Sequence, residues 1–382
     1  MNWQNSTTSS GFQEENRIST GRRLLYRFHI DLPLWIGIML LSAMGMVVLY
    51  SAGDQSVELL NRQFVRLFIA FIVMLAVAQI SPATLKHWAP WMFGIGLLML
   101  VAVLAFGEVG KGAQRWLNLG FFRFQPSELM KIAVPIMTAW YLAEAALPPR
   151  RMRIIVASII VLVPTLLIAK QPDLGTSLLI ASSGIFVLLL AGLGWRLIFS
   201  VLILMAASAP IFWNYLLHDY QRQRIITLFN PESDPLGAGY HIIQSTIAIG
   251  SGGLYGKGWL NGTQSHLDFL PERSTDFVFA VFSEEFGFLG TLLLLAVYIA
   301  VISRGLIIAV NAQDTFSRLL AGSITLTFFV YVFVNIGMVS GILPVVGLPL
   351  PLISYGGTSM VTIMAAFGIL MSIQTHRKLV ST

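Results

Sequence analysis

Strongly polar side chains stand at the borders of long apolar segments at several places in this chain. They are Arg115, Arg123, Glu128, Lys131, Lys170, Asp173, Gln221, Arg222, Arg224, Asp276, Glu284 and Glu285. Arginine and lysine bind phosphate oxygens, and a carboxylate can act as a general base on a hydroxyl group. Because a charge within a membrane-spanning segment is costly, such residues default to a functional role. Together they indicate a site for a phosphorylated or otherwise anionic lipid, but they do not name the reaction.

Asp276 opens a long apolar segment. On a helix that began here, four small residues would share its face: Ala280, Ser283, Gly287 and Gly290. Such a face packs against other helices or borders a cavity, so we expect Asp276 to point inward. The spacing leaves two roles open, an N-terminal helix cap or a catalytic or ligand-binding carboxylate.

Other charged positions also permit two interpretations each. Glu128 and Lys131 are three residues apart at the start of an apolar segment, where they form a local ion pair or belong to a site. Asp173 precedes another apolar segment, where a turn or helix cap is the alternative to a ligand-binding role. The stretch Gln221–Arg224 follows a tyrosine, and its arginines either extend to the membrane interface or bind the ligand.

Signals for other classes of site are weak. The stretch Gly252–Gly258 is rich in glycine, but glycine follows its lysine, so it fails the Walker phosphate-binding pattern. The histidines show no paired spacing typical of zinc sites, and the absence of cysteine excludes thiolate catalysis and disulfides. No nucleic-acid-binding motif is present, so nucleic acid is not an expected partner.

The elements that must position these side chains are those of a membrane protein. Of the 382 residues 56% are hydrophobic and 11% are charged, whereas soluble domains carry about 25% charged residues. The apolar segments predict helices at residues 34–52, 64–80, 91–106, 128–147, 153–169, 176–193, 196–214, 277–303, 317–339 and 353–373. Long apolar runs such as Ile154–Ala169 exclude a barrel of alternating strands. The fold class is therefore all-α, a polytopic membrane protein of about ten transmembrane helices.

Basic residues predict the orientation of this bundle. Residues 1–33 are polar and basic toward their end, which indicates a cytoplasmic tail. An even number of spans over residues 34–373 then returns the basic tail 374–382 to the same side. Residues 215–276 form a large extracytoplasmic loop between spans seven and eight, where we expect short helices at the membrane surface and a glycine-rich turn.

Four stretches resemble the SEDS family (shape, elongation, division and sporulation), in the same order and over nearly the whole chain. They are KGAQRWLNLGFFRFQPSELMK (Lys111–Lys131), KQPDLGTS (Lys170–Ser177), GSGGLYGKGWLNGTQSHLDFLPERSTDFVFAVFSEEFGFLG (Gly250–Gly290) and NIGMVSGILPVVGLPLPLISYGGTS (Asn335–Ser359). The short N-terminal tail and the LNGTQSHLDFLPE stretch resemble the elongation branch of the family rather than its division branch.

The resemblance implies a peptidoglycan glycosyltransferase that polymerises lipid II at the outer face of the bacterial cytoplasmic (inner) membrane. In this family the aspartate of the (H/S)TDF motif, here Asp276, is the catalytic residue. It is proposed to deprotonate the 4-hydroxyl of the acceptor GlcNAc, whose oxygen attacks the anomeric carbon of the donor MurNAc as undecaprenyl pyrophosphate leaves. Ser274 stands where many members have histidine, which weakens any assisting role for that position but not the role of Asp276.

The resemblance also implies a substrate site and partners. Substrate-binding roles fall on Arg123, Glu128, Lys131, Asp173, Gln221 and Arg224, to which we add Arg115. No organic cofactor is expected; a divalent cation, Mg²⁺ or Mn²⁺, held near Asp276, Glu128 and Asp173 is a further expectation, because these metals prefer oxygen ligands. Expected partners are lipid II, the nascent glycan strand, membrane lipid, the elongation machinery and a class B penicillin-binding protein. That transpeptidase is expected to contact spans eight and nine and the large loop.

Two alternatives from other classes stay open. A lipid II flippase is also a multi-span bundle with charges, but it needs a polar path across the bilayer, and the inner halves of these spans carry almost no charge. A non-catalytic scaffold for the transpeptidase would need no buried carboxylates. The concentration of charge at one face therefore favours chemistry there.

Overall fold

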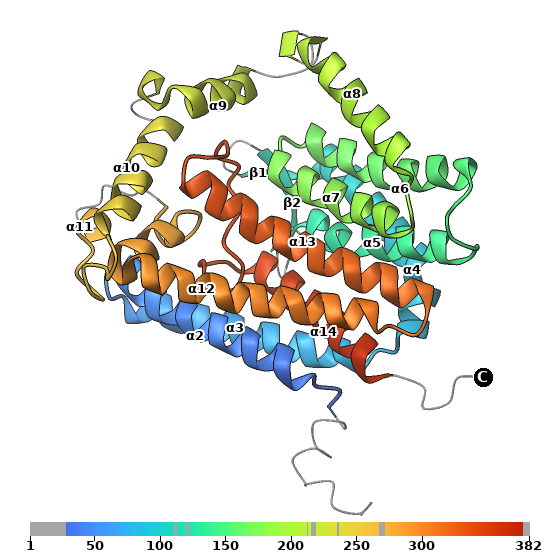
Figure 1. Cartoon of the computed structure of the whole chain (residues 1–382), viewed down its shortest axis with the longest axis horizontal. Coiled ribbons are helices and arrows are strands. Elements are labelled where there is room, and N and C mark those ends of the chain that lie inside the picture. The colour runs from blue at the N-terminus through green and yellow to red at the C-terminus, as the bar shows by residue number, and fades with distance from the viewer. Residues whose placement is uncertain are drawn as a thin grey trace, which may run out of the picture.

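The computed structural model describes residues 28–110, 113–118, 120, 123–211, 213–214, 219–234, 237–266 and 272–376. Within these residues ten long helices overlap the ten predicted segments, although several begin or end at other residues. They are α2 (Leu32–Ala52), α3 (Val57–Ala78), α4 (Pro82–Phe106), α5 (Pro126–Ala143), α6 (Arg151–Lys170), α7 (Leu174–Leu190), α8 (Trp195–Ile211), α12 (Val278–Val310), α13 (Thr315–Val339) and α14 (Thr358–Thr375). The helix α13 is central, because it packs against α5, α7, α12 and α14 (Figure 1).

Most of these helices are long and apolar enough to cross a membrane. In the part of the chain that the structure describes, seven meet that description: α2, α3, α4, α6, α12, α13 and α14. The helix α7 is apolar but shorter. The prediction of an all-α polytopic membrane protein is confirmed, and the count of ten crossings stays a prediction, as does the division into tails and membrane domain.

Two helices begin earlier than predicted. The helix α3 starts at Val57 rather than at residue 64, and α4 starts at Pro82 rather than at residue 91. The side chains of Ser56 and Ser81 cap them by accepting hydrogen bonds from backbone N–H groups. Polar and charged residues are interspersed in the first two turns of both helices, Glu58, Asn61, Arg62 and Gln63 in α3 and Thr84, Lys86 and His87 in α4, so hydropathy placed the starts too late.

The segment before α14 is not helical, which corrects the predicted start at residue 353. Residues 343–357 run as extended chain and turns, with Gly347 in the left-handed region at φ +78°. The hydroxyl of Ser354 accepts a hydrogen bond from Leu350 N at 2.7 Å. Leu350 and Ile353 are buried. Irregular backbone at membrane depth is tolerated where protein covers it or where it lines a cavity.

A small antiparallel sheet, which the sequence did not predict, follows α4. Its strands are β1 (Glu108–Gly110), β2 (Ala113–Asn118) and β3 (Arg123–Phe124), in the order β1-β2-β3. Leu117 pairs with Phe124 in the register of the last two strands. The sheet carries Arg115 and Arg123 to the start of α5.

The large loop forms an arch with α8 (Figure 1). It contains α9 (Asp219–Phe229), the short 3₁₀ helix η3 (Pro231–Ser233), α10 (Ala238–Ser251) and α11 (Thr263–His266). The expected short helices are therefore present, and residues 215–218, 235–236 and 267–271 of this loop lie outside the described residues.

The helix α12 is broken at Gly287, whose φ of +64° and ψ of −163° suit glycine alone. The glycine-rich loop 252–258 supplies the missing hydrogen bonds. Lys257 N donates to Glu284 O at 3.0 Å, and Phe288 N donates to Gly253 O at 2.9 Å. This break corrects the expected helical face, because Gly287 and Gly290 do not continue the face on which Asp276 was placed.

Candidate active site

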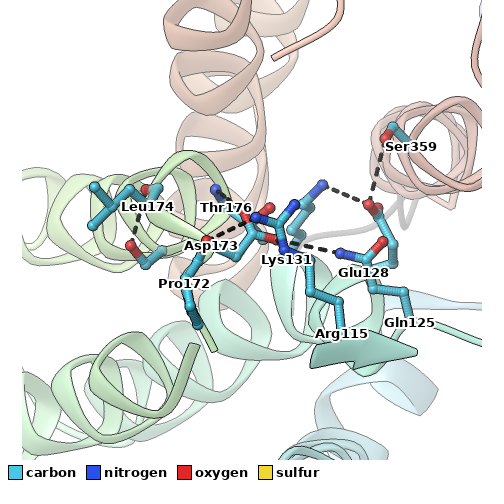
Figure 2. Close-up of polar contacts among 10 residues, drawn as sticks. Arg115, Gln125, Glu128, Lys131, Pro172, Asp173, Leu174, Thr176 and Ser359 are labelled. Carbon is cyan, nitrogen blue, oxygen red and sulfur yellow. Dashed lines mark hydrogen bonds and ion pairs between the residues drawn. The ribbon is translucent and has the colours of Figure 1, made fainter. Parts of the chain in front are cut away.

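A buried ion pair lies at the N-terminus of α5. Pro126 occupies the first turn, and Lys131 Nζ lies 2.8 Å from Glu128 Oε1, with side-chain exposures of 7% and 8%. The hydroxyl of Ser359, in the first turn of α14, donates to the same Glu128 oxygen at 3.4 Å (Figure 2). Lys131 Nζ also lies 5.4 Å from the centre of the Tyr331 ring on α13. The predicted local pair is confirmed, and it joins three helices.

Asp173 caps α7, as one of its two interpretations predicted, by accepting a hydrogen bond from Thr176 N at 3.2 Å. Its other oxygen lies 3.4 Å from Gln125 Nε2 and 3.5 Å from Arg115 Nε. Arg115 also donates to Pro172 O at 2.7 Å. Figure 2 shows Arg115, Asp173, Gln125 and Lys131 gathered where α5 and α7 begin. The cap is therefore also part of the polar cluster.

A hollow of about 320 Å³ adjoins this cluster between α3, α5 and α14. Arg123, Glu128, Arg66 and Thr358 are among the residues that line it. Arg123 is 70% exposed and lies 3.3 Å from Glu108. The hollow therefore has basic groups at its rim and a buried carboxylate in its wall.

Asp276 lies in the turn before α12, and the cap position of that helix is Phe277, one residue later. Asn335 Nδ2 donates to Asp276 O at 2.9 Å and to Leu348 O at 2.7 Å. A Cβ atom placed on Gly347 would lie 3.4 Å from Asp276 Oδ2, so the carboxylate lies against the irregular segment before α14. A single buried amide on α13 thus joins the backbone of the candidate catalytic residue to the irregular segment before α14.

The surroundings of Asp276 also include α10 and the hollow. The ring of His241 stacks on Phe277, with centroids 5.3 Å apart, and burial lowers the pKa of His241 below its ordinary value. Tyr355 N donates to Ser274 O at 2.8 Å. The segment that carries Asp276 is therefore tied to the start of α14, which lines the hollow.

Other predicted polar residues lie elsewhere. Gln221 and Arg224 lie on α9 in the arch, away from α5 and α7 (Figure 1). Arg222 donates to the carbonyl of Trp213 at 2.8 Å. Glu284 is fully buried at the break in α12 and pairs with Lys257 at 2.7 Å. The structure thus brings together Arg115, Glu128, Lys131 and Asp173, with Arg123 at the edge of the group.

Two residues at the site were not predicted. Asn335 is a single amide in the apolar segment that became α13, and Arg66 is a cation inside the predicted span 64–80. In both cases a single polar side chain within an apolar segment could have indicated a functional position.

Among the described residues, no group of three or more His, Asp or Glu side chains is arranged to hold a metal ion. Lys131 and Arg115 instead supply positive charge to Glu128 and Asp173. A divalent cation near Asp276, Glu128 and Asp173 stays a prediction.

The fold and the site define a multi-pass membrane protein with a cluster of ionisable residues where several helices begin. A family model for FtsW, RodA and SpoVE, described as "Cell cycle protein", matches residues 25–379. The chain belongs to this family.

Curated relatives match the chain over most of its length. The peptidoglycan glycosyltransferase MrdB of Escherichia coli K12 is 56% identical over 355 residues, covering 93% of this chain and 96% of that protein. The peptidoglycan glycosyltransferase RodA of Treponema pallidum is 32% identical over 423 aligned positions, covering 91% of this chain and 98% of that protein.

Solved structures share the fold. A chain in a peptidoglycan synthase complex that coordinates polymerization and crosslinking superposes with a TM-score of 0.79 at 32% identity, covering 91% of this chain and 99% of that one. The rod shape determining protein RodA of Thermus thermophilus gives a TM-score of 0.69 at 28% identity, covering 91% and 98%.

Proposed function

We propose that this peptidoglycan glycosyltransferase of cell elongation, a multi-pass protein of the inner membrane, polymerises lipid II at the outer membrane face. One observation carries the proposal. The buried amide of Asn335 holds the backbone of Asp276, and Tyr355 ties the same segment to the start of α14, where Ser359 contacts Glu128. These hydrogen bonds fix the position of the Asp276 backbone, as a carboxylate that must meet a substrate hydroxyl requires.

In the proposed reaction, Asp276 takes the proton from the 4-hydroxyl of the acceptor GlcNAc. The hydroxyl oxygen forms a bond to the anomeric carbon of the donor MurNAc, and the bond from that carbon to undecaprenyl pyrophosphate breaks. Arg123 and Lys131, with Arg224 supplied by the arch, neutralise the charge that develops on the leaving pyrophosphate. Fixed cations serve this purpose well because they need no reorganisation during the reaction.

The carboxylates of Glu128 and Asp173 have a second part in this scheme. They hold Lys131 and Arg115 in place, and Glu128 Oε2, which has no hydrogen-bond partner among the described residues, is available to a sugar hydroxyl. A divalent cation bound there would add Lewis-acid chemistry at the phosphates. Its presence is tested by polymerisation with and without a chelator, with Mg²⁺ or Mn²⁺ added back.

The distribution of polar groups supports chemistry at one face. Next to Lys131 lies a small cavity of about 50 Å³, which is lined mostly by apolar residues such as Ile132, Pro135 and Phe328 and also by the hydroxyl groups of Thr327, Tyr331 and Thr362. Apart from Lys131, no charged residue lines it. A translocation path for a pyrophosphate head group would need further charged groups along it, since a charge is costly inside a bilayer. This supports a polymerase over a flippase.

We also propose that the partner is a class B penicillin-binding protein, whose single span packs on α12 and α13. Exposed apolar side chains on these helices include Phe288, Leu292, Phe329 and Phe333. The structural relative in a peptidoglycan synthase complex supports such a partner. Both termini are proposed to be cytoplasmic.

The deciding experiment reconstitutes the purified chain on lipid II, with and without the transpeptidase, and looks for glycan polymer on gels. Asp276→Asn should abolish the product while leaving folding and partner binding intact. Glu232→Gln, which changes an exposed carboxylate in the same large loop, is the matched control and should polymerise normally. Full polymerisation by Asp276→Asn would show that Asp276 is not the general base. Protein-dependent movement of lipid II across vesicles, without polymer, would favour the flippase.

A further inference from the structure

The ring of His241 lies against the residue that follows Asp276. His241, in the first turn of α10, stacks on Phe277 with the ring centroids 5.3 Å apart and the ring planes 18° apart. Phe277 is buried, with 2% of its surface exposed. The proposed reaction gives His241 no part, although this histidine lies beside the segment that carries the proposed base.

The start of α12 depends on tertiary contacts of this kind. Phe277 is the cap residue of α12 and makes no side-chain cap hydrogen bond, so this helix start lacks the stabilisation that Ser, Thr, Asn or Asp gives at a cap. The N–H of Phe277 donates to Glu272 O over a long distance of 3.4 Å. Packing of the Phe277 ring therefore helps to decide where the turn before α12 lies.

The helix α10 is fixed to the same helix that holds Asp276. Ser245, one turn after His241, donates its hydroxyl to Val339 O on α13 at 2.8 Å. Asn335, one turn before Val339 on α13, donates to Asp276 O. His241 and Asn335 thus approach the turn that carries Asp276 from two elements that are themselves hydrogen-bonded to each other.

The surroundings of His241 favour its neutral ring. The Nδ1 atom is buried and has no hydrogen-bond partner among the described residues. Protonation would place a charged N–H donor there without an acceptor, and such a buried donor is costly. The stacked position therefore suits a neutral imidazole better than a charged one.

Ionisable side chains also lie on the elements that pack against α10 and in the turn before α12. They include Asp219, Arg222 and Arg224 on α9, Glu232 on η3, and Arg273, Asp276, Glu284 and Glu285 in that turn and on α12. The charges that act on the His241 ring are those of Glu272 and Asp234, which raise its pKa. Burial outweighs them and lowers the pKa of His241 below its ordinary value of about 6.5.

We infer that the neutral ring of His241 is a positioning residue for the proposed base, because it holds Phe277 and with it the backbone of Asp276 where the acceptor hydroxyl must arrive. The inference rests on the proposed function. In this scheme His241 does not touch the substrate and acts through Phe277 alone.

The sign of the pH dependence follows from the buried ring. A ring released into solvent takes up a proton below about pH 6.5, whereas the stacked ring takes one up only at lower pH. As the pH falls below about 6.5, proton uptake therefore favours release of the ring and loosens the turn. Because α10 belongs to the large loop on the proposed outer face, external acid would slow polymerisation.

The first test measures polymerisation of lipid II by the full chain in nanodiscs, with His241→Ala, His241→Phe and the control His87→Ala. His87 is an exposed histidine on α4, outside the site. At neutral pH His241→Ala should lower kcat about 10- to 100-fold, since a misplacement of about 1 Å has effects of this size, and leave KM for lipid II largely unchanged. His241→Phe keeps a ring for the stack and should recover most of kcat, and His87→Ala should match the wild type.

The pH profile separates the charge of His241 from its shape. The kcat of the wild type should fall as the pH is lowered below about 6.5, and His241→Phe, whose ring takes up no proton, should lack this step. Full kcat in a folded His241→Ala variant would overturn the inference. So would the same loss of kcat in acid for His241→Phe and the wild type.

Hydrogen exchange at residues 272–280 tests the positioning without the reaction. After correction for intrinsic rates, exchange there should be faster in His241→Ala, and in the wild type at acid pH, but not in His241→Phe or His87→Ala. Unchanged exchange in His241→Ala would overturn the inference. These exchange rates in a wild-type chain that makes no polymer would instead contradict the proposed function, so the two failures are distinguishable.

Discussion

The ion pair between Glu128 and Lys131 is almost entirely removed from solvent. Desolvation of two charges offsets most of their attraction, so such a pair adds little net stability, while loss of one partner leaves a buried charge that costs about 3–5 kcal/mol. The pair is therefore better explained by the proposed binding of a ligand by Glu128 and Lys131 than by a contribution to stability. Its stability cost and its functional role can be separated by experiment.

Lys131→Met should lower the free energy of unfolding by about 3 kcal/mol and abolish polymerisation, because it leaves the Glu128 carboxylate buried without a cation. The double variant Glu128→Gln/Lys131→Met removes both charges and should recover most of the stability but none of the activity. Denaturation in detergent and polymer gels measure the two quantities. Recovery of activity in the double variant would show that the pair is structural.

Residue types were predictable from the sequence, but their grouping was not. Glu128 and Asp173 stood out because each borders an apolar segment. That Gln125 and Arg115 join them depends on the sheet after α4, whose short strands lay in a segment treated as a connection. Asn335 was missed because its partners are backbone carbonyls of distant segments, which no local pattern reveals.

Among the elements, α12 shows what the apolar pattern of a sequence predicts and what it does not. The apolar run predicted a continuous helix from Asp276, and a helix is present, but Gly287 breaks it. The break requires a glycine because a Cβ atom there would lie 2.2 Å from Gly256 N. A small residue in an apolar run looks the same in sequence whether it packs against a helix or ends one.

Gly287→Ala should lower the free energy of unfolding by about 3 kcal/mol or more, because it combines an unfavourable backbone conformation with a collision against the backbone of the glycine-rich loop. Gly94→Ala is the control. Gly94 lies inside α4 with nothing within 4 Å of an added Cβ, so this change should be neutral or stabilising by about 0.5–1 kcal/mol. Thermal unfolding of both variants in the same detergent gives the comparison, and equal stability would show that the break is not needed.

At the scale of the whole molecule, hydropathy located every long helix because the lipid-facing and core-facing surfaces are both apolar. It placed helix starts too late where a serine cap and interspersed polar residues precede the apolar run, as after Ser56 and Ser81. It also started the last helix at residue 353, although the irregular segment before α14 continues to residue 357. Orientation rests on the basic residues alone.

The chain has no cysteine, so single introduced cysteines test its orientation cleanly. Ala83→Cys lies in the first turn of α4, on the side predicted to be cytoplasmic, and Ser233→Cys lies in the large loop; both positions are exposed. An impermeant maleimide added to intact spheroplasts should label Ser233→Cys and leave Ala83→Cys unlabelled until the membrane is permeabilised. The reverse pattern would invert the proposed topology.

The break in α12 also joins the large loop to this helix through backbone hydrogen bonds. Backbone hydrogen bonds between the loop 253–258 and α12 replace those that Gly287 interrupts, so residues 278–286, which follow Asp276, are bonded directly to the loop. We therefore expect a partner that displaces the loop to displace the first part of α12 and the turn that carries Asp276 with it. We expect inserted residues between Gly253 and Gly258, which change the length of this linkage, to uncouple partner binding from polymerisation.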